Sequence, residues 1–167
     1  AASYPSKPIR LVVPFPPGGG NDLVARLLAP PLGVALGHNV VVDNRAGGGA
    51  NIGAEVVAKA SPDGYMVLMG AVVHAVNATL YGKLGYNLVK DFAPVSLLAS
   101  TPNVLVVHPS LPVKSVKALI ALARSQPGQL NYASAGTGGS VHLAGELFKS
   151  LAKVDMVHVP YKGSGPA

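Results

Sequence analysis

Two glycine-rich segments are the parts of this sequence best suited to bind a ligand. Residues 16–22 read PPGGGND, and residues 135–140 read AGTGGS. Each follows an apolar run and precedes a helical pattern, so each predicts a helix that starts directly after a strand. The free N–H groups of such a helix start, together with the helix dipole, attract anions. The glycines could instead serve only to make tight turns, but two such loops in different halves of the chain favour a shared anionic ligand.

Two side chains beside the predicted loops could also contact a ligand. Asp22 lies in the first loop, where it is expected either to cap the following helix or to accept a hydrogen bond from a ligand amine, hydroxyl or water. His74 follows the third predicted strand, at the expected edge of the cleft. Both are therefore candidate binding residues.

The remaining histidines predict no metal site. His142 and Glu146 lie four residues apart on a predicted helix and could share a metal, but no third ligand is spaced to join them. We therefore interpret them as a surface pair. The isolated histidines are interpreted as structural or solvated residues: His38, His108 and His158.

Nucleotide and catalytic motifs are incomplete in this chain. Neither glycine-rich loop has the lysine of a P-loop or the spacing of a dinucleotide site, although Asp43 resembles a ribose-binding acid. Residues 163–165 (GSG) lack the upstream glycine of a nucleophile elbow. An S-x-x-K match at Ser150 falls at the end of a predicted helix. These patterns argue against an enzyme and against a cofactor. The alternative is a nucleotide-dependent α/β enzyme that binds phosphate on the glycine-rich loops.

Composition excludes several other classes of protein. The 167 residues are 49% hydrophobic and 12% charged, which excludes a wholly disordered chain. No uninterrupted apolar run approaches the ~20 residues of a membrane-spanning helix. The chain has no cysteine and therefore no disulfide or thiolate chemistry. Its net charge of +6 is dispersed and aromatic residues are few, which argues against nucleic-acid binding.

The predicted elements place the two loops on an α/β fold. Short apolar runs that alternate with helical patterns are typical of parallel strands buried on both faces. Strands are predicted at 9–15, 39–45, 65–70, 95–100, 104–108, 130–135 and 156–161. Helices are predicted at 23–36, 51–60, 113–125 and 140–153, with Asn21 and Asp22 as N-cap candidates, a kink or break at Pro30 and Pro31, and an end at Gly37. Residues 71–94 are predicted to be irregular, with a helical turn near 77–81.

A stiff polar break divides the chain into two predicted lobes. Residues 101–103 read TPN and separate two predicted strands, which is a pattern typical of a hinge. We therefore expect a first lobe at 1–100, a hinge crossing at 101–103 and the first part of a second lobe at 104–167.

Six motifs give the sequence a resemblance to a known family. They occur in order along the whole chain, and the chain resembles the Bug family, the periplasmic substrate-binding proteins of tripartite tricarboxylate transporters. The motifs are YPSKPIR (4–10), VPFPPGG (13–19) followed by Asp22, VDNR (42–45), GANIG (49–53), PDGY (62–65) and VPYKG (159–163).

The resemblance implies a fold and a function. The expected fold is an α/β, periplasmic-binding-protein-like (type II) Venus flytrap with parallel-sheet lobes and flanking helices. It would close on a small di- or tricarboxylate or related organic acid and present it to the membrane permease. The implied ligand-binding residues are Phe15, Pro17, Gly18, Gly19, Asn21 and Asp22 in the first loop, Ala71 and His74 in a third wall, and Ser134, Gly136, Thr137, Gly138 and Ser140 in the second loop.

Members of the Bug family are longer than this chain, which leads to three further expectations. The second lobe is expected to be incomplete, as in a truncated or proteolysed product. Apolar surface that the missing part would cover is expected to be exposed, and dimerisation or strand exchange would hide it. Residues 1–5 (AASYP) resemble the start of a mature periplasmic protein after signal-peptide removal.

Overall fold

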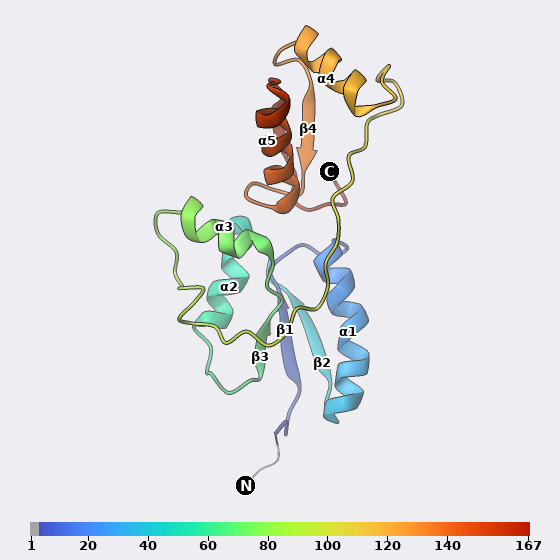
Figure 1. The fold of residues 1–167 in the computed structure, drawn as a ribbon. Coiled ribbons are helices and arrows are strands. Elements are labelled where there is room, and N and C mark those ends of the chain that lie inside the picture. Colours follow the sequence, from blue (N-terminus) through green and yellow to red (C-terminus); the bar gives the residue numbers. More distant parts are fainter. Residues whose placement is uncertain (1–3) are drawn as a thin grey trace.

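Two small parallel sheets, joined by a long extended segment, make up this protein (Figure 1). The structure is a computed structural model that describes residues 4–167. The first three residues of the predicted mature N-terminus, Ala1–Ser3, lie outside the described residues.

The first sheet has the strand order β2-β1-β3, and all its strands are parallel. Its strands are β1 (Ile9–Val13), β2 (Val40–Asn44) and β3 (Met66–Leu68). The central strand β1 is buried, and Val12 and Val13 have no exposed surface. The prediction that the second strand is buried on both faces is wrong, because β2 lies at the edge of the sheet and Val41 is 50% exposed.

Three helices flank the first sheet: α1 (Gly20–Leu36), α2 (Asn51–Ala58) and α3 (Val72–Leu80). A short 3-10 turn, η1 (Gly48–Ala50), precedes α2. Of the kink or break predicted at Pro30 and Pro31, the break is wrong, because α1 continues through both residues. Both prolines are exposed, so water can reach the carbonyl groups that lack an N–H partner. The predicted end at Gly37 is confirmed, since this residue has a φ of 69° and its N–H donates to the Val34 carbonyl.

Helix α3 occupies residues 72–80 of the stretch 71–94 that the sequence predicted to be irregular, whereas residues 81–94 form no helix or strand. Its buried face includes Val73, His74 and Asn77. Two of these residues are polar, so the apolar periodicity that identifies a helix is interrupted. The prediction of only a helical turn near residues 77–81 is therefore wrong.

The segment 81–115 links the two sheets without a helix or strand of its own. It runs from the first sheet to α4 in Figure 1. The strands predicted at 95–100 and 104–108 do not form. Within residues 4–167 no strand pairs with them, and their side chains are largely exposed, with Val95 at 87% and Val106 at 79%. A β-strand needs the backbone partners of a neighbouring strand.

The second sheet consists of β4 (Asn131–Ser134) and β5 (Val157–Pro160), which are parallel. Helices α4 (Val116–Ser125) and α5 (Ser140–Ala152) accompany it. Helix α4 starts later than predicted because the Ser115 hydroxyl accepts a hydrogen bond from the Ala118 N–H at 3.1 Å and caps it there. A small core of Ala123, Ala152, Val154 and Met156 holds this unit together. Within residues 4–167, no helix combines the length and apolar character needed to cross a membrane.

Candidate functional site

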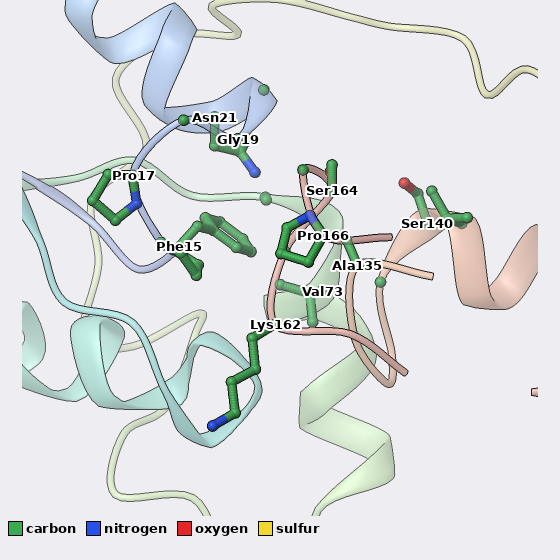
Figure 2. Close-up of a pocket in the computed structure, with 18 of the residues that line it drawn as sticks. Phe15, Pro17, Gly19, Asn21, Val73, Ala135, Ser140, Lys162, Ser164 and Pro166 are labelled. Carbon is green, nitrogen blue, oxygen red and sulfur yellow. The ribbon is translucent and has the colours of Figure 1, made fainter. Parts of the chain in front are cut away.

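A pocket lies between the two sheets, at the carboxyl ends of four parallel strands (Figure 2). It encloses about 280 Å³, a volume suited to a small ligand. Loops that follow β1, β3, β4 and β5 supply its walls, which is where open α/β sheets bind ligands. The lining residues are 15–21, 71–73, Ala135, 139–141 and 162–166.

Three helices begin at this pocket. The first two residues of each helix line it: 20–21 of α1, 72–73 of α3 and 140–141 of α5. The N–H groups of a first helical turn have no partner within the helix. Three sets of such donors are therefore placed around one small cavity, and each helix dipole adds partial positive charge there.

In the first loop, the backbone conformation positions the start of α1. Gly19 is the N-cap residue with φ −81° and ψ 168°, and its carbonyl accepts the N–H of Leu23 at 2.9 Å. Gly18 has a φ of +81°, a conformation that L side chains rarely adopt. The expectation that Asn21 or Asp22 caps the helix is wrong, because the N-cap is Gly19 and no side chain caps it.

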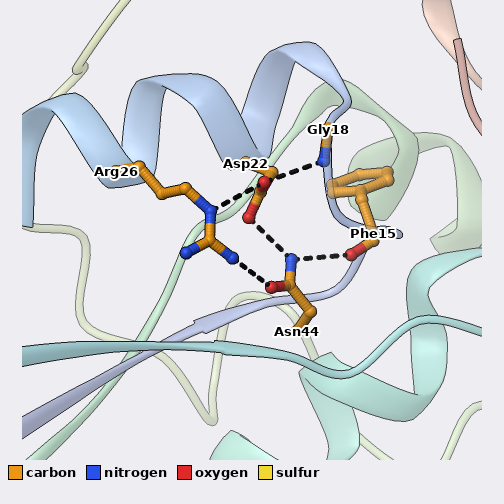
Figure 3. Close-up of polar contacts among 5 residues, drawn as sticks. All are labelled: Phe15, Gly18, Asp22, Arg26 and Asn44. Atoms are coloured by element: carbon orange, nitrogen blue, oxygen red, sulfur yellow. Dashed lines mark hydrogen bonds and ion pairs between the residues drawn. The ribbon is translucent and has the colours of Figure 1, made fainter. Parts of the chain in front are cut away.

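Asp22 does not line the pocket. Its carboxylate instead accepts hydrogen bonds from the first loop and from neighbouring side chains (Figure 3). It is 3% exposed. Its Oδ2 accepts hydrogen bonds from the Gly18 N–H at 2.8 Å and from Arg26 Nε at 2.9 Å. Its Oδ1 accepts from Asn44 Nδ2 at 2.9 Å, and the same Asn44 nitrogen donates to the Phe15 carbonyl at 3.1 Å. The hydrogen bond from Arg26 is the main reason that the pKa of Asp22 falls to about 2.

The second loop repeats the geometry of the first. Gly139 is the N-cap of α5 with φ −73° and ψ 164°, and its carbonyl accepts the N–H of Leu143 at 3.0 Å. Gly138 has a φ of +81°, the same value as Gly18. Its N–H donates to Nδ1 of His142 at 3.1 Å. His142 thus occupies the place in α5 that Asp22 occupies in α1, so the interpretation of His142 as part of a surface pair misses its role in the loop.

The other predicted residues of the second loop do not line the pocket. Ser134 is 1% exposed, and its Oγ accepts the Gly136 N–H at 3.2 Å and lies 2.6 Å from Nε2 of His158. His158 is thus neither isolated nor solvated. Gly138 packs on α3: a Cβ placed there would lie 3.4 Å from Oδ1 of Asn77. Thr137 is exposed and is absent from the lining.

In the third wall, Ala71 lines the pocket and His74 lies beneath it. His74 is 1% exposed, and its Nδ1 accepts the Ala71 N–H at 3.0 Å. Burial lowers the pKa of this imidazole, an effect partly offset by the backbone groups of Ala71 and Ala50. The ring meets Phe15 edge-on, with 6.4 Å between ring centroids. His74 therefore supports the wall from behind.

The predicted residues thus fall into two groups. Those that line the pocket are Phe15, Pro17, Gly18, Gly19, Asn21, Ala71 and Ser140. Those that do not line it are Asp22, His74, Ser134, Gly136, Thr137 and Gly138. Direct ligand contact by members of either group stays a prediction.

Sequence reasoning missed one wall of the pocket, residues 162–166, which follow β5. The signal was present, because KGSGP is another glycine-rich loop that follows a strand. Lys162 is the one charged residue among the lining residues, and Figure 2 shows its ammonium group pointing away from Ser140 and Ser164. The predicted hinge also reaches the site, since Asn103 Nδ2 donates to the Ser140 carbonyl at 3.3 Å.

The chemistry of the pocket is that of anion binding by backbone groups. Its lining contains no carboxylate and no histidine, and no cluster of three or more potential metal ligands occurs in residues 4–167. Backbone N–H donors with one aromatic ring and several prolines suit a ligand with anionic ends and an apolar middle.

Sequence comparisons match the chain to transporter receptors. The family model described as "Tripartite tricarboxylate transporter family receptor" matches residues 24–167. A UPF0065 protein from the tcbD-tcbE intergenic region of Pseudomonas sp. (strain P51) is 45% identical over 165 residues, covering 99% of this chain and 49% of the relative. Protein BugT of Bordetella pertussis is 43% identical over 169 residues, covering 100% and 52%. The chain spans about half the length of these curated relatives.

Solved structures agree with these matches. A structure described as a periplasmic transporter has a TM-score of 0.93 at 46% identity, covering 99% of this chain and 56% of the other. Rpa4515 of R. palustris with adipate has a TM-score of 0.94 at 44% identity, covering 98% and 55%. MatC (Rpa3494) from Rhodopseudomonas palustris with bound malate has a TM-score of 0.88 at 35% identity, covering 98% and 56%. The predicted periplasmic-binding-protein fold with an incomplete second lobe is confirmed, and the family that matches is one of transporter receptors.

Proposed function

Because the chain belongs to the tripartite tricarboxylate transporter receptor family, as the Bug resemblance implied, we propose that it captures a small carboxylate in the pocket between its two sheets. It acts in the periplasm and presents the ligand to the membrane permease of a tripartite tricarboxylate transporter. The lobes meet at the hinge predicted at residues 101–103. The nucleotide-dependent enzyme that was the alternative is set aside, since the matched proteins are receptors and binding proteins.

The convergence of three helix starts on one pocket is the observation that carries this proposal. A carboxylate accepts hydrogen bonds from the free N–H groups at residues 20–21 or 140–141, which face the pocket from opposite lobes. An anion at a helix N-terminus is typically stabilised by ~0.3–1 kcal/mol, and by up to ~2 kcal/mol where it is partly buried. Contacts from both lobes would stabilise the closed arrangement only when the ligand is present.

A short linear dicarboxylate fits this arrangement best. The two loops supply donors at opposite ends of the pocket, and the Phe15 ring and the Pro16 and Pro166 rings line the space between. Adipate and malate, named with two of the similar structures, each carry two carboxylates. We therefore assign the carboxylates to the two loops and the carbon chain to the apolar lining.

Isothermal titration with adipate and malate tests the proposal. Adipamide, which has the shape of adipate without its charge, is the matched control, and ATP and NAD test the alternative. We expect heat of binding from at least one dicarboxylate and none from adipamide. Binding of a nucleotide alone, or equal binding of adipate and adipamide, would contradict the proposal.

Association with a second copy of the chain stays a prediction. Apolar side chains in the linking segment are largely exposed: Val95, Leu97, Val104 and Val106. Exposed apolar surface of this kind favours association. Light scattering after size exclusion measures the mass directly, and a mass of one chain at high concentration would contradict dimerisation.

A further inference from the structure

We propose that His142 is a positioning residue of the second loop and that the loop keeps its binding geometry only while this imidazole is unprotonated. The inference rests on the proposed function, because the loop is one of the two that would hold the ligand. It adds a dependence on pH that the first loop does not share.

The correspondence between His142 and Asp22 is the first step. Each is the third residue of its helix, α5 and α1 respectively. Each accepts the N–H of a glycine four residues earlier, Gly138 at 3.1 Å and Gly18 at 2.8 Å. Both glycines have a φ of +81°. The side chain at this helical position therefore fixes the loop in both lobes, through a carboxylate in one and an imidazole in the other.

The two acceptors respond differently to protons. A neutral imidazole can accept a hydrogen bond at Nδ1, but an imidazolium carries protons on both nitrogens and accepts none. The bond from Gly138 therefore requires the neutral ring with its proton on Nε2. Asp22 stays ionised far below neutral pH because its pKa is lowered to about 2, chiefly by Arg26. Acidification thus releases the second loop and leaves the first in place.

A second histidine holds the other end of the same loop. The rings of His142 and His158 stack with 4.1 Å between centroids. Nε2 of His158 lies 2.6 Å from Ser134 Oγ, and that hydroxyl accepts the Gly136 N–H at 3.2 Å. Both ends of the loop are consequently tied to one imidazole pair. Two imidazolium rings at this spacing repel each other, so the pair favours at most one charge.

The charged groups beside the pair, Glu146 and Lys149, hydrogen-bond to other side chains and act on the imidazoles only through their charge. Glu146, on the same helix, accepts hydrogen bonds from Tyr132 at 2.6 Å and from Lys149 at 2.9 Å. Lys149 also lies over the Tyr132 ring, 5.9 Å from its centroid. On β5, the pKa of His158 is lowered by burial and, to a lesser extent, by His142. No hydrogen bond of Glu146 to either imidazole occurs among the described residues.

Release of Gly138 would alter the pocket in two ways. Gly139 and Ser140 follow it directly and line the pocket, so their N–H donors move with the loop. Gly138 also packs against α3 of the first lobe, where its missing Cβ leaves room for Leu80 and Asn77. Loss of the hydrogen bond to His142 therefore weakens both the anion site and the contact between lobes.

An amide and imidazole titration by NMR tests the inference without any ligand. The ¹⁵N-labelled chain is titrated from about pH 8 to about pH 5, a range that spans ordinary histidine titration. We expect the Gly138 amide resonance to shift with the same midpoint as His142. In His142→Asn the amide oxygen replaces Nδ1 as a non-titrating acceptor, and the Gly138 shift should disappear. Gly18 serves as the internal control and should not move.

Adipate titration supplies the second readout. Affinity should fall about tenfold between the two ends of the same pH titration, the effect of losing roughly one hydrogen bond. In His142→Asn the affinity should fall less than about twofold over this range. In the control His38→Asn it should fall by the same factor as in the wild type. His142→Ala should bind weakly at both pH values. Ligand protonation and the other histidines, His74 included, are common to wild type and His142→Asn, so the difference isolates His142.

Several outcomes would overturn the inference. The inference fails if the Gly138 amide resonance does not follow the titration of His142, or if His142 stays neutral to about pH 5. It also fails if the pH dependence of adipate affinity in His142→Asn equals that of the wild type. If adipate and malate fail to bind at every pH, the proposed function fails. The NMR titration still decides the role of His142 in that case.

Discussion

The carboxylate of Asp22 accepts the backbone N–H of Gly18, four residues earlier, at 2.8 Å. This bond turns the side chain back under the loop and leaves the N–H groups of residues 20–21 facing the pocket. Arg26 and Asn44 complete the arrangement, with hydrogen bonds of 2.9 Å each to the same carboxylate (Figure 3). We therefore expect Asp22 to act on a ligand through the backbone of the first loop and not by direct contact.

Asp22→Ala should destabilise the protein and weaken all dicarboxylates equally. The change leaves the Gly18 N–H without its acceptor and leaves Asn44 Nδ2 with only the Phe15 carbonyl, which typically costs ~1–3 kcal/mol. Because Asp22 lies outside the lining, the hydroxy acid malate and the plain diacid adipate should lose the same factor. Urea unfolding and calorimetry measure the two effects. Asp155→Ala, at an exposed position, is the control. A larger loss for malate would mean that Asp22 contacts the ligand after all.

Acid should remove the stabilisation that Asp22 provides. Its pKa is lowered from 3.8 to about 2 in the folded protein, so the unfolded chain binds the proton more readily. This contribution is present above about pH 4 and is lost as the pH falls toward 2. The free energy of unfolding of the wild type should therefore drop more steeply over this range than that of Asp22→Asn. Parallel curves for the two proteins would assign the acid sensitivity to other groups.

Much of the fold could be predicted because its elements follow local rules. The strand–glycine–helix pattern correctly predicted β1, α1, β4 and α5, and Gly37 ends α1 as expected. The strands at 95–100 and 104–108 failed because a strand depends on a partner that periodicity does not reveal. Helix α3 was missed because His74 and Asn77, two polar residues, lie on its buried face.

The site was predictable in its backbone and less so in its side chains. Glycine spacing identified two of the loops that line the pocket, since a helix start needs only local sequence. The orientation of the Asp22 side chain depends on a hydrogen bond from Asn44, which lies on strand β2. The role of His142 depends on Gly138 adopting a left-handed conformation. The contact with Asn44 is tertiary and leaves no spacing signal, whereas the bond between Gly138 and His142 is local and repeats the four-residue spacing of Gly18 and Asp22.

His74 should make stability fall on mild acidification. Burial lowers the pKa of this imidazole from 6.5, so the unfolded chain takes up the proton first. Its contribution is therefore present above about pH 6.5 and declines below it. His74→Asn keeps an acceptor for the Ala71 N–H but does not titrate. Its unfolding free energy should be lower near neutral pH, by ~1–2 kcal/mol for lost packing, and should fall less toward pH ~5.

Denaturant unfolding at a series of pH values measures this difference. His38→Asn, a change at a less buried histidine of the same lobe, is the matched control and should follow the wild type. A His74→Asn protein with the full acid sensitivity of the wild type would show that His74 does not titrate differently on folding.

Gly138→Ala and Gly18→Ala should separate backbone strain from the contact between lobes. Both glycines have a φ of +81°, so each alanine should cost ~1–2 kcal/mol of strain. At Gly18 a Cβ meets nothing within 4 Å, whereas at Gly138 it meets Leu80 Cδ2 at 3.3 Å and Asn77 Oδ1 at 3.4 Å. Gly138→Ala should therefore also push the second loop away from α3.

Two measurements distinguish these effects. Unfolding free energies should fall in both variants because of the shared strain, and further in Gly138→Ala because its Cβ also crowds Leu80 and Asn77. Adipate affinity should fall further in Gly138→Ala, by about tenfold relative to Gly18→Ala if about 1.4 kcal/mol of closing energy is lost. Equal affinities would mean that the loop does not need its contact with Asn77 and Leu80 to hold the ligand, and that each lobe binds its carboxylate independently.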